Sequence, residues 1–267
     1  HSGHRASAIR PLVPLNEKLR RRRRPASGRA PGSWPTSGWP ASPCGPRGCR
    51  ETLRIGIVTT FAEKLQPILD MLASRAWKNA APDQDGDFLL YPSDVARGTD
   101  VESLHEALEA MYRHARRWAP GLDVPFFVPP VHLGVTGLAG NFVVDGESYA
   151  TVGVAPDLLD NTGVVLATLA HEACHHILRQ SDLSQVDDVA LDEITTDLAM
   201  FVCGFGELAL LGHSHVVHVP GGDRRAHLGY LSPEEIRQAH EHVLARRVAL
   251  GLPARSTRGK RRGGPAR

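Results

Sequence analysis

The residues of this 267-residue chain best suited to chemistry are His171, Glu172 and His175, which form the pattern H-E-x-x-H. They lie in the run TGVVLATLAHEACHHILR, residues 162–179, whose apolar residues predict a buried helix. Residues four apart project from one face of a helix, so the two imidazoles can bind one metal ion. Glu172 lies about 100° further round the helix, where its carboxylate can approach a metal-bound water.

A catalytic zinc ion needs three protein ligands and one position open for water. The run VALDEITTDLAMFVCGFGELALL, residues 189–211, predicts a second helix that follows a short polar loop. Glu193 on this helix, 18 residues after His175, is the best candidate for the third ligand. Asp197, one turn further, would accept a hydrogen bond from a ligand imidazole. Asp192 competes as a ligand, but it lies near the helix start, where acidic residues usually interact with the helix dipole.

These two motifs together resemble the gluzincin group of zinc metallopeptidases, the thermolysin-like clan. The resemblance rests on HEACH at 171–175 and DEITTD at 192–197, which match H-E-x-x-H followed by E-x-x-x-D on a second helix. It covers roughly residues 141–210, about a quarter of the chain.

What the resemblance implies is a Zn²⁺ ion bound by His171, His175 and Glu193, with Asp197 hydrogen-bonded behind a ligand. Glu172 would be the general base, which takes a proton from zinc-bound water during attack on a peptide carbonyl and delivers it to the leaving amine. The expected function is therefore zinc-dependent hydrolysis of a peptide or protein substrate. The alternative is a non-catalytic, regulatory zinc-binding module that holds a peptide on the same fold.

Members of that clan also place a downstream His or Tyr where it can stabilise the oxyanion. His213, His215, His218 and Tyr230 all qualify by position, and His218 and Tyr230 are our candidates. The competing interpretation is that the three histidines are solvent-facing loop residues.

The elements around the motif predict an α+β fold, in which a small N-terminal sheet with a hairpin edge strand packs on a helical zincin-like core. A strand is expected at 87–92 and a hairpin at 141–154, turning at Asp145-Gly146. An exposed strand beside a metal site can bind an extended peptide.

Further helices are expected ahead of and behind the motif. Capping boxes predict helices that start at Thr60, with a bend at Pro67, and at Thr99. Residues 211–230 are expected to form a loop or irregular hairpin before a final helix that starts at Ser232.

Charge and composition divide the chain into three parts. Residues 1–52 hold 11 Lys and Arg against two Asp and Glu, and residues 246–267 hold eight against none. The sequence predicts a disordered basic leader at 1–52, a metallopeptidase domain at 53–250 and a disordered basic tail at 251–267. Within the domain, 53–160 form the α/β part and 161–250 the helical part with the site.

The basic tails suggest a third hypothesis, in which the protein contacts nucleic acid or an acidic membrane surface through them. The leader lacks the interleaved aromatic residues or folded platform that would favour it. No apolar run reaches the length of a membrane span, and no secretory signal is recognisable. The sequence therefore predicts a cytoplasmic protein without a membrane span.

Overall fold

The computed structural model describes residues 60–254, apart from positions 83, 96, 135–138, 146–148, 186 and 220–221. The side chains of 145, 149, 214–219 and 222–227 are also outside the description. The predicted leader and most of the predicted tail lie outside the described residues, so the domain boundaries remain predictions.

The helices at the start of the described chain follow their local signals with one exception. They are α2 (Phe61–Lys64), α3 (Gln66–Ala76), α4 (Pro92–Val95) and α5 (Val101–Trp118). The capping box of Thr60 with Glu63 is present, and Pro67 opens α3 after a break at Leu65. The predicted cap of α5, Thr99, is wrong by one residue, because the carboxylate of Asp100 accepts the Ser103 N–H at 3.0 Å.

Three strands form the sheet beside the motif helix. They are β1 (Val131–Leu133), β2 (Gly140–Asp145) and β3 (Tyr149–Val154), in the order β1-β3-β2. β2 and β3 are antiparallel, which confirms the pairing of the predicted hairpin, whereas Gly146 of its predicted turn lies outside the described residues; β1 lies parallel to β3. Among the described strands, β2 is an edge of the sheet.

The strand predicted at residues 87–92 is absent from the structure. Phe88, Leu89 and Leu90 are buried, but they fill the helical core from a bent segment. Leu90 N–H donates to the Gly204 carbonyl at 2.9 Å, and the Phe88 ring meets that of Trp118 edge-on. A short apolar run of this kind has no periodicity that distinguishes a strand from core-filling coil.

The second half of the described chain is mainly helical. Its elements are η1 (Pro156–Leu158), α6 (Thr162–Gln180), α7 (Val189–Val202), α8 (Gly206–Gly212), β4 (Ser214–Val219), β5 (Gly222–His227) and α9 (Pro233–Ala249). The helix predicted over 189–211 is two helices, because Gly204 has φ +87° and a side chain there would meet Phe88 O at 2.2 Å. Strands β4 and β5 pair in a regular antiparallel ladder where a loop or irregular hairpin was expected, and Ser232 caps α9 as predicted.

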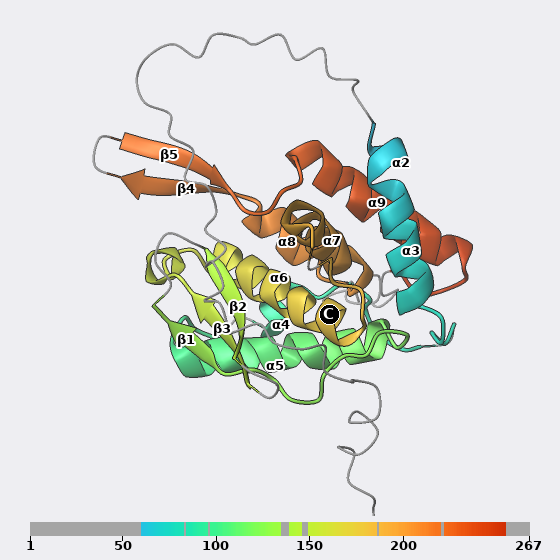
Figure 1. Cartoon of the computed structure of the whole chain (residues 1–267), viewed down its shortest axis with the longest axis horizontal. Coiled ribbons are helices and arrows are strands. Elements are labelled where there is room, and N and C mark those ends of the chain that lie inside the picture. Colours follow the sequence, from blue (N-terminus) through green and yellow to red (C-terminus); the bar gives the residue numbers. More distant parts are fainter. Residues whose placement is uncertain are drawn as a thin grey trace, which may run out of the picture. The chain divides into compact units, whose positions relative to one another are not determined.

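The motif helix α6 is the centre of this α+β fold. It contacts α5, α7, α8, β2 and β3, and most of its side chains are buried. In Figure 1, α6 lies between the β1-β3-β2 sheet on one side and α7 with α8 on the other. Residues of α6 can therefore meet side chains from both the sheet and the second helix.

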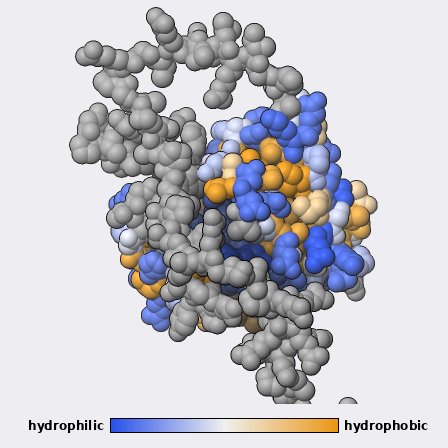
Figure 2. Space-filling view, viewed as in Figure 1, coloured by the Kyte–Doolittle hydropathy of each residue, from blue (hydrophilic) through white to orange (hydrophobic). Residues whose placement is uncertain are grey.

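The outer surface mixes polar and apolar residues. Figure 2 shows hydrophilic and hydrophobic areas next to each other on one face. Phe126, Phe127, Leu211 and Val248 are among the exposed large apolar residues. Within the described part of the chain, no helix has both the length and the apolar character that crossing a membrane requires.

Candidate metal centre

Helices α6 and α7 bring together the three residues that the sequence nominates as ligands. Nε2 of His171 lies 3.1 Å from Glu193 Oε2, and Nε2 of His175 lies 3.4 Å from the same oxygen. One ligand atom from each residue lies within 4.8 Å of the others. The two imidazole rings meet edge-on at 4.7 Å between centroids, as their four-residue spacing on one helix requires.

This donor set suits a metal ion. Two imidazole nitrogens and one carboxylate oxygen converge on one point, which is the ligand set of many catalytic zinc sites. Other first-row divalent metals accept the same donors, so the geometry supports a metal centre without selecting the metal.

The outward-facing nitrogens of both imidazoles have acceptors. Nδ1 of His171 lies 3.0 Å from Asp197 Oδ1, and the other oxygen of Asp197 accepts the Tyr230 backbone N–H at 2.6 Å. A ring that donates through Nδ1 keeps Nε2 free of a proton for a metal. The residue that the sequence placed as a hydrogen-bond acceptor behind a ligand is therefore in contact with His171.

The partner of His175 was not identified from the sequence. Its Nδ1 lies 3.1 Å from Thr196 Oγ1 and 3.6 Å from Asp192 Oδ2. The Thr196 hydroxyl donates to the Asp192 carbonyl at 2.8 Å, so its lone pair is left to accept from His175. Asp192, the competing ligand candidate, faces Nδ1 and accepts from the Ser184 hydroxyl at 2.8 Å.

Without a metal, the neighbouring carboxylates favour the charged form of both His171 and His175. Burial opposes the charged form of His171, but hydrogen bonds to Asp197 and Glu193 outweigh it and raise its pKa well above the ordinary value. Burial also opposes the charge on His175, yet Asp192 and Glu193 raise its pKa to about 9. For Glu193, burial is likewise outweighed by the two histidines, which lower its pKa.

These raised pKa values predict that the metal-free protein is more stable at pH 6 than at pH 9. A histidine whose pKa is higher in the folded protein than in the unfolded chain stabilises the folded protein. This contribution is complete at pH values below the pKa of the unfolded chain and is lost as the pH rises through the pKa of the folded protein. For His175 the rise from 6.5 to about 9 corresponds to roughly 3 kcal/mol. Urea unfolding with a chelator at both pH values measures the difference, which should shrink in His175→Gln. Equal stabilities in the unsubstituted protein would contradict the prediction.

Replacing Asp197 by asparagine should weaken metal binding by about 10- to 100-fold, the usual effect of losing a carboxylate behind a ligand imidazole. The amide lacks the negative charge that favours His171 as a donor, and its NH₂ group cannot accept from both His171 and Tyr230. Competition with a fluorescent zinc chelator measures the affinity. Asp182→Asn is the matched control, because Asp182 is exposed and its positive φ of 55° suits asparagine. Equal zinc affinities in the two variants would argue against this role.

Glu172 is buried beside the metal triad and next to strand β2. Its side chain faces the same cavity as His171, and burial raises its pKa. A Cβ atom at Gly140 of β2 would lie 2.4 Å from Thr168 Cγ2 and 2.8 Å from Glu172 Oε1. Gly140 thus lets the strand approach the helix at this carboxylate, a requirement that the sequence motif does not reveal.

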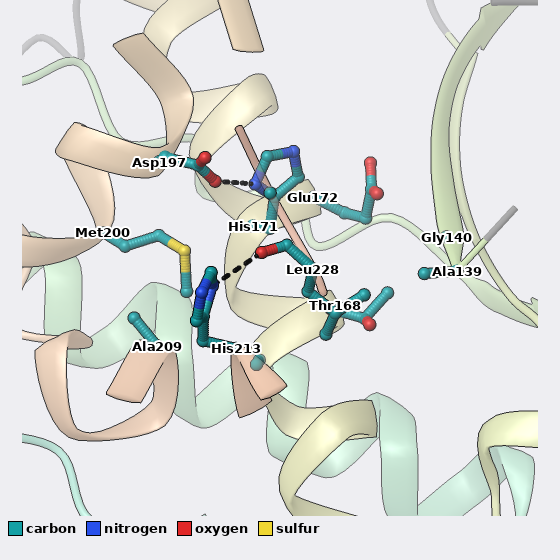
Figure 3. Close-up of a pocket in the computed structure, with 12 residues that line it drawn as sticks. Ala139, Gly140, Thr168, His171, Glu172, Asp197, Met200, Ala209, His213 and Leu228 are labelled. Atoms are coloured by element: carbon teal, nitrogen blue, oxygen red, sulfur yellow. Dashed lines mark hydrogen bonds and ion pairs between the residues drawn. The ribbon is translucent and has the colours of Figure 1, made fainter. Parts of the chain in front are cut away.

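A cavity opens next to His171 and Glu172 (Figure 3). It encloses about 390 Å³ of space not filled by atoms, part of it continuous with solvent. Its lining residues are Ala139, Gly140, Ala167, Thr168, His171, Glu172, Asp197, Met200, Ala209, His213, Leu228 and Gly229. The candidate metal centre is therefore reached from an open, mainly apolar pocket.

The oxyanion candidates are placed differently. Tyr230 is 41% exposed at the edge of the site, and burial together with the charges of Glu193 and Asp197 raises the pKa of its phenol. His218 lies on β4, and its side chain is outside the described part. His213 is buried and donates through Nδ1 to Leu228 O at 3.0 Å, so the solvent-facing interpretation is wrong for this histidine.

His176, next to the ligand His175, faces away from the metal triad. It is buried, its Nδ1 accepts from the Tyr112 hydroxyl at 2.8 Å, and its ring stacks on Phe142 of β2 at 4.9 Å. Burial lowers its pKa to about 4, so the ring is neutral. It therefore packs α6 against both α5 and strand β2.

Comparison of the chain with protein-family models, curated proteins and solved structures gave no match in any of the three. The assignment of the site therefore rests on the geometry of His171, His175 and Glu193.

Proposed function

We propose that this protein is a zinc-dependent peptidase of the gluzincin type. The observation that carries the proposal is the convergence of His171 Nε2, His175 Nε2 and Glu193 Oε2 beside an open cavity, with the buried carboxylate of Glu172 on the cavity wall. A purely structural zinc site is closed by four protein ligands and has no use for a carboxylate beside an open position.

In this proposal His171, His175 and Glu193 hold the zinc ion, and Asp197 and Thr196 fix the two imidazole rings. A bound zinc ion supplies Lewis acidity and makes water a nucleophile near neutral pH. Glu172 takes the proton from the attacking water and passes it to the leaving amine. Its raised pKa suits this role, because a general base works best when its pKa approaches the working pH.

Strand β2 gives an extended peptide a place to bind. Ala155 N–H donates to Ala139 O at 3.1 Å, and Val152 N–H donates to Pro130 O on the other side of β3 at 3.0 Å, which sets the phase of the β2–β3 ladder. Bonded pairs alternate along an antiparallel ladder, which leaves the N–H and C=O groups of Gly140 and Phe142 at the strand's outer edge. A peptide paired with these groups would pass beside Glu172.

The test is metal content and proteolysis measured on the same preparation. We expect about one zinc per chain, hydrolysis of quenched fluorescent casein, loss of hydrolysis with 1,10-phenanthroline and recovery with added zinc. His171→Ala should lose both metal and activity, and His132→Ala, at an exposed histidine of β1, should keep both. Zinc bound without hydrolysis of any peptide would favour the non-catalytic module instead.

A further inference from the structure

Several walls of the cavity beside the metal centre are built from the smallest residues. Ala167 of α6 and Ala209 of α8 contribute only methyl groups, and Gly140 and Gly229 contribute none. Two features require glycine at position 229. Its φ is +82°, and a Cβ atom there would lie 2.6 Å from Asp197 Oδ2. The pocket exists at this point because larger side chains are absent.

Larger side chains close the cavity at depth. Met200 of α7 is buried three residues beyond Asp197, and it lies with Ala209 and His213 on the side opposite Gly140 in Figure 3. The His213 ring is held by its hydrogen bond to Leu228 O, so this wall has a fixed position. A side chain that entered past Glu172 would end against Met200.

The size of this space limits what can enter. The part that the centre of a water molecule can reach is about 40 Å³. One water needs roughly 10–15 Å³ by this measure, so the cavity takes about three non-hydrogen atoms. The side chains of alanine, serine, threonine and valine fit this limit, whereas those of leucine, lysine and phenylalanine exceed it.

We propose that this cavity selects a small, uncharged side chain on the substrate residue next to the bond that is cut. The inference rests on the proposed peptidase function and names its substrate class. The cavity shares His171 and Glu172 with the metal centre, so a side chain inside it belongs to a residue adjacent to the attacked carbonyl. Acidic side chains are disfavoured as well, because the carboxylates of Glu172 and Asp197 border the space.

Mapping of cleavage sites tests the inference. The full-length zinc-loaded protein is incubated with a synthetic peptide mixture in which all residues occur on both sides of every bond, and the products are sequenced by mass spectrometry. We expect Ala, Ser, Thr or Val at one fixed position beside the cut, favoured over Leu and Phe by at least about tenfold, since each misfitting methylene costs 10- to 200-fold.

Two substitutions should move this preference in opposite directions. Met200→Ala deepens the cavity and should admit Leu and Phe, and Ala209→Val narrows it and should restrict cleavage to Gly, Ala and Ser. Leu198→Ala is the control, because Leu198 is fully buried on α7 but does not line the cavity, so it should keep the original preference.

The outcomes separate the two proposals. Absence of any cleavage by the zinc-loaded protein would reject the peptidase function itself. Cleavage without a preference for small residues, or with a preference that neither cavity variant changes, would overturn the inference and leave the peptidase function standing. The second variant also keeps the test decisive if one of them does not fold.

Discussion

Replacing Glu172 by glutamine should abolish peptide hydrolysis while the metal stays bound. The amide has nearly the same shape as the carboxylate but cannot accept a proton, and loss of a general base costs about 10²- to 10⁴-fold in rate. Glu172 is absent from the candidate ligand triad, so the zinc content should remain at about one per chain.

The same substitution should preserve or slightly raise stability. Burial raises the pKa of Glu172, which means that keeping it ionised at neutral pH destabilises the folded protein. A neutral amide removes this cost. A loss of activity caused by misfolding would instead lower the melting temperature, so thermal unfolding distinguishes the two explanations.

The measurement compares kcat, zinc content and melting temperature of Glu172→Gln with those of Glu109→Gln. Glu109 is half-exposed on α5, where its carboxylate lies 3.6 Å from Nε2 of His105 at the surface, so its variant should match the unsubstituted protein. If Glu172→Gln still hydrolysed casein at more than about a tenth of the original rate, Glu172 could not be the general base, because that loss is smaller than the range for such a group.

Much of this site was predictable because it depends on helix periodicity. H-E-x-x-H fixes the relation of His171 to His175, and four-residue spacing likewise places Glu193 and Asp197 on one face of α7. A short loop then brings the two helices into contact.

The parts that escaped prediction depend on contacts between distant elements. Gly140 matters because β2 crosses Glu172, and Thr196 matters because α7 is rotated to face His175. The cavity combines residues from β2, α6, α7, α8 and the segment after β5. No local pattern encodes such combinations. For the same reason the run at 87–92 was mistaken for a strand, since its burial comes from Trp118 and Gly204 far along the chain.

Metal affinity should fall steeply as the pH is lowered from 9 to 7. In the metal-free protein both His171 and His175 have raised pKa values, and that of His175 is about 9. At neutral pH each ring is therefore the charged imidazolium, with protons on both nitrogens. Metal binding through Nε2 must release these protons. The dissociation constant should therefore increase by up to about 100-fold per pH unit, whereas ordinary histidines would give no dependence above about pH 7.5.

Competition titrations with a zinc chelator of known pH dependence, run between pH 7 and 9, measure this slope. The lowered pKa of Glu193 keeps that carboxylate ionised throughout, so Glu193 itself does not contribute to the slope. In Asp197→Asn the weaker acceptor lowers the pKa of His171, and the slope should fall towards tenfold per pH unit. A flat profile in the unsubstituted protein would mean that the imidazoles are already neutral at pH 7. The negative charges of Asp192, Glu193 and Asp197 would then be balanced by a group other than the two imidazolium rings.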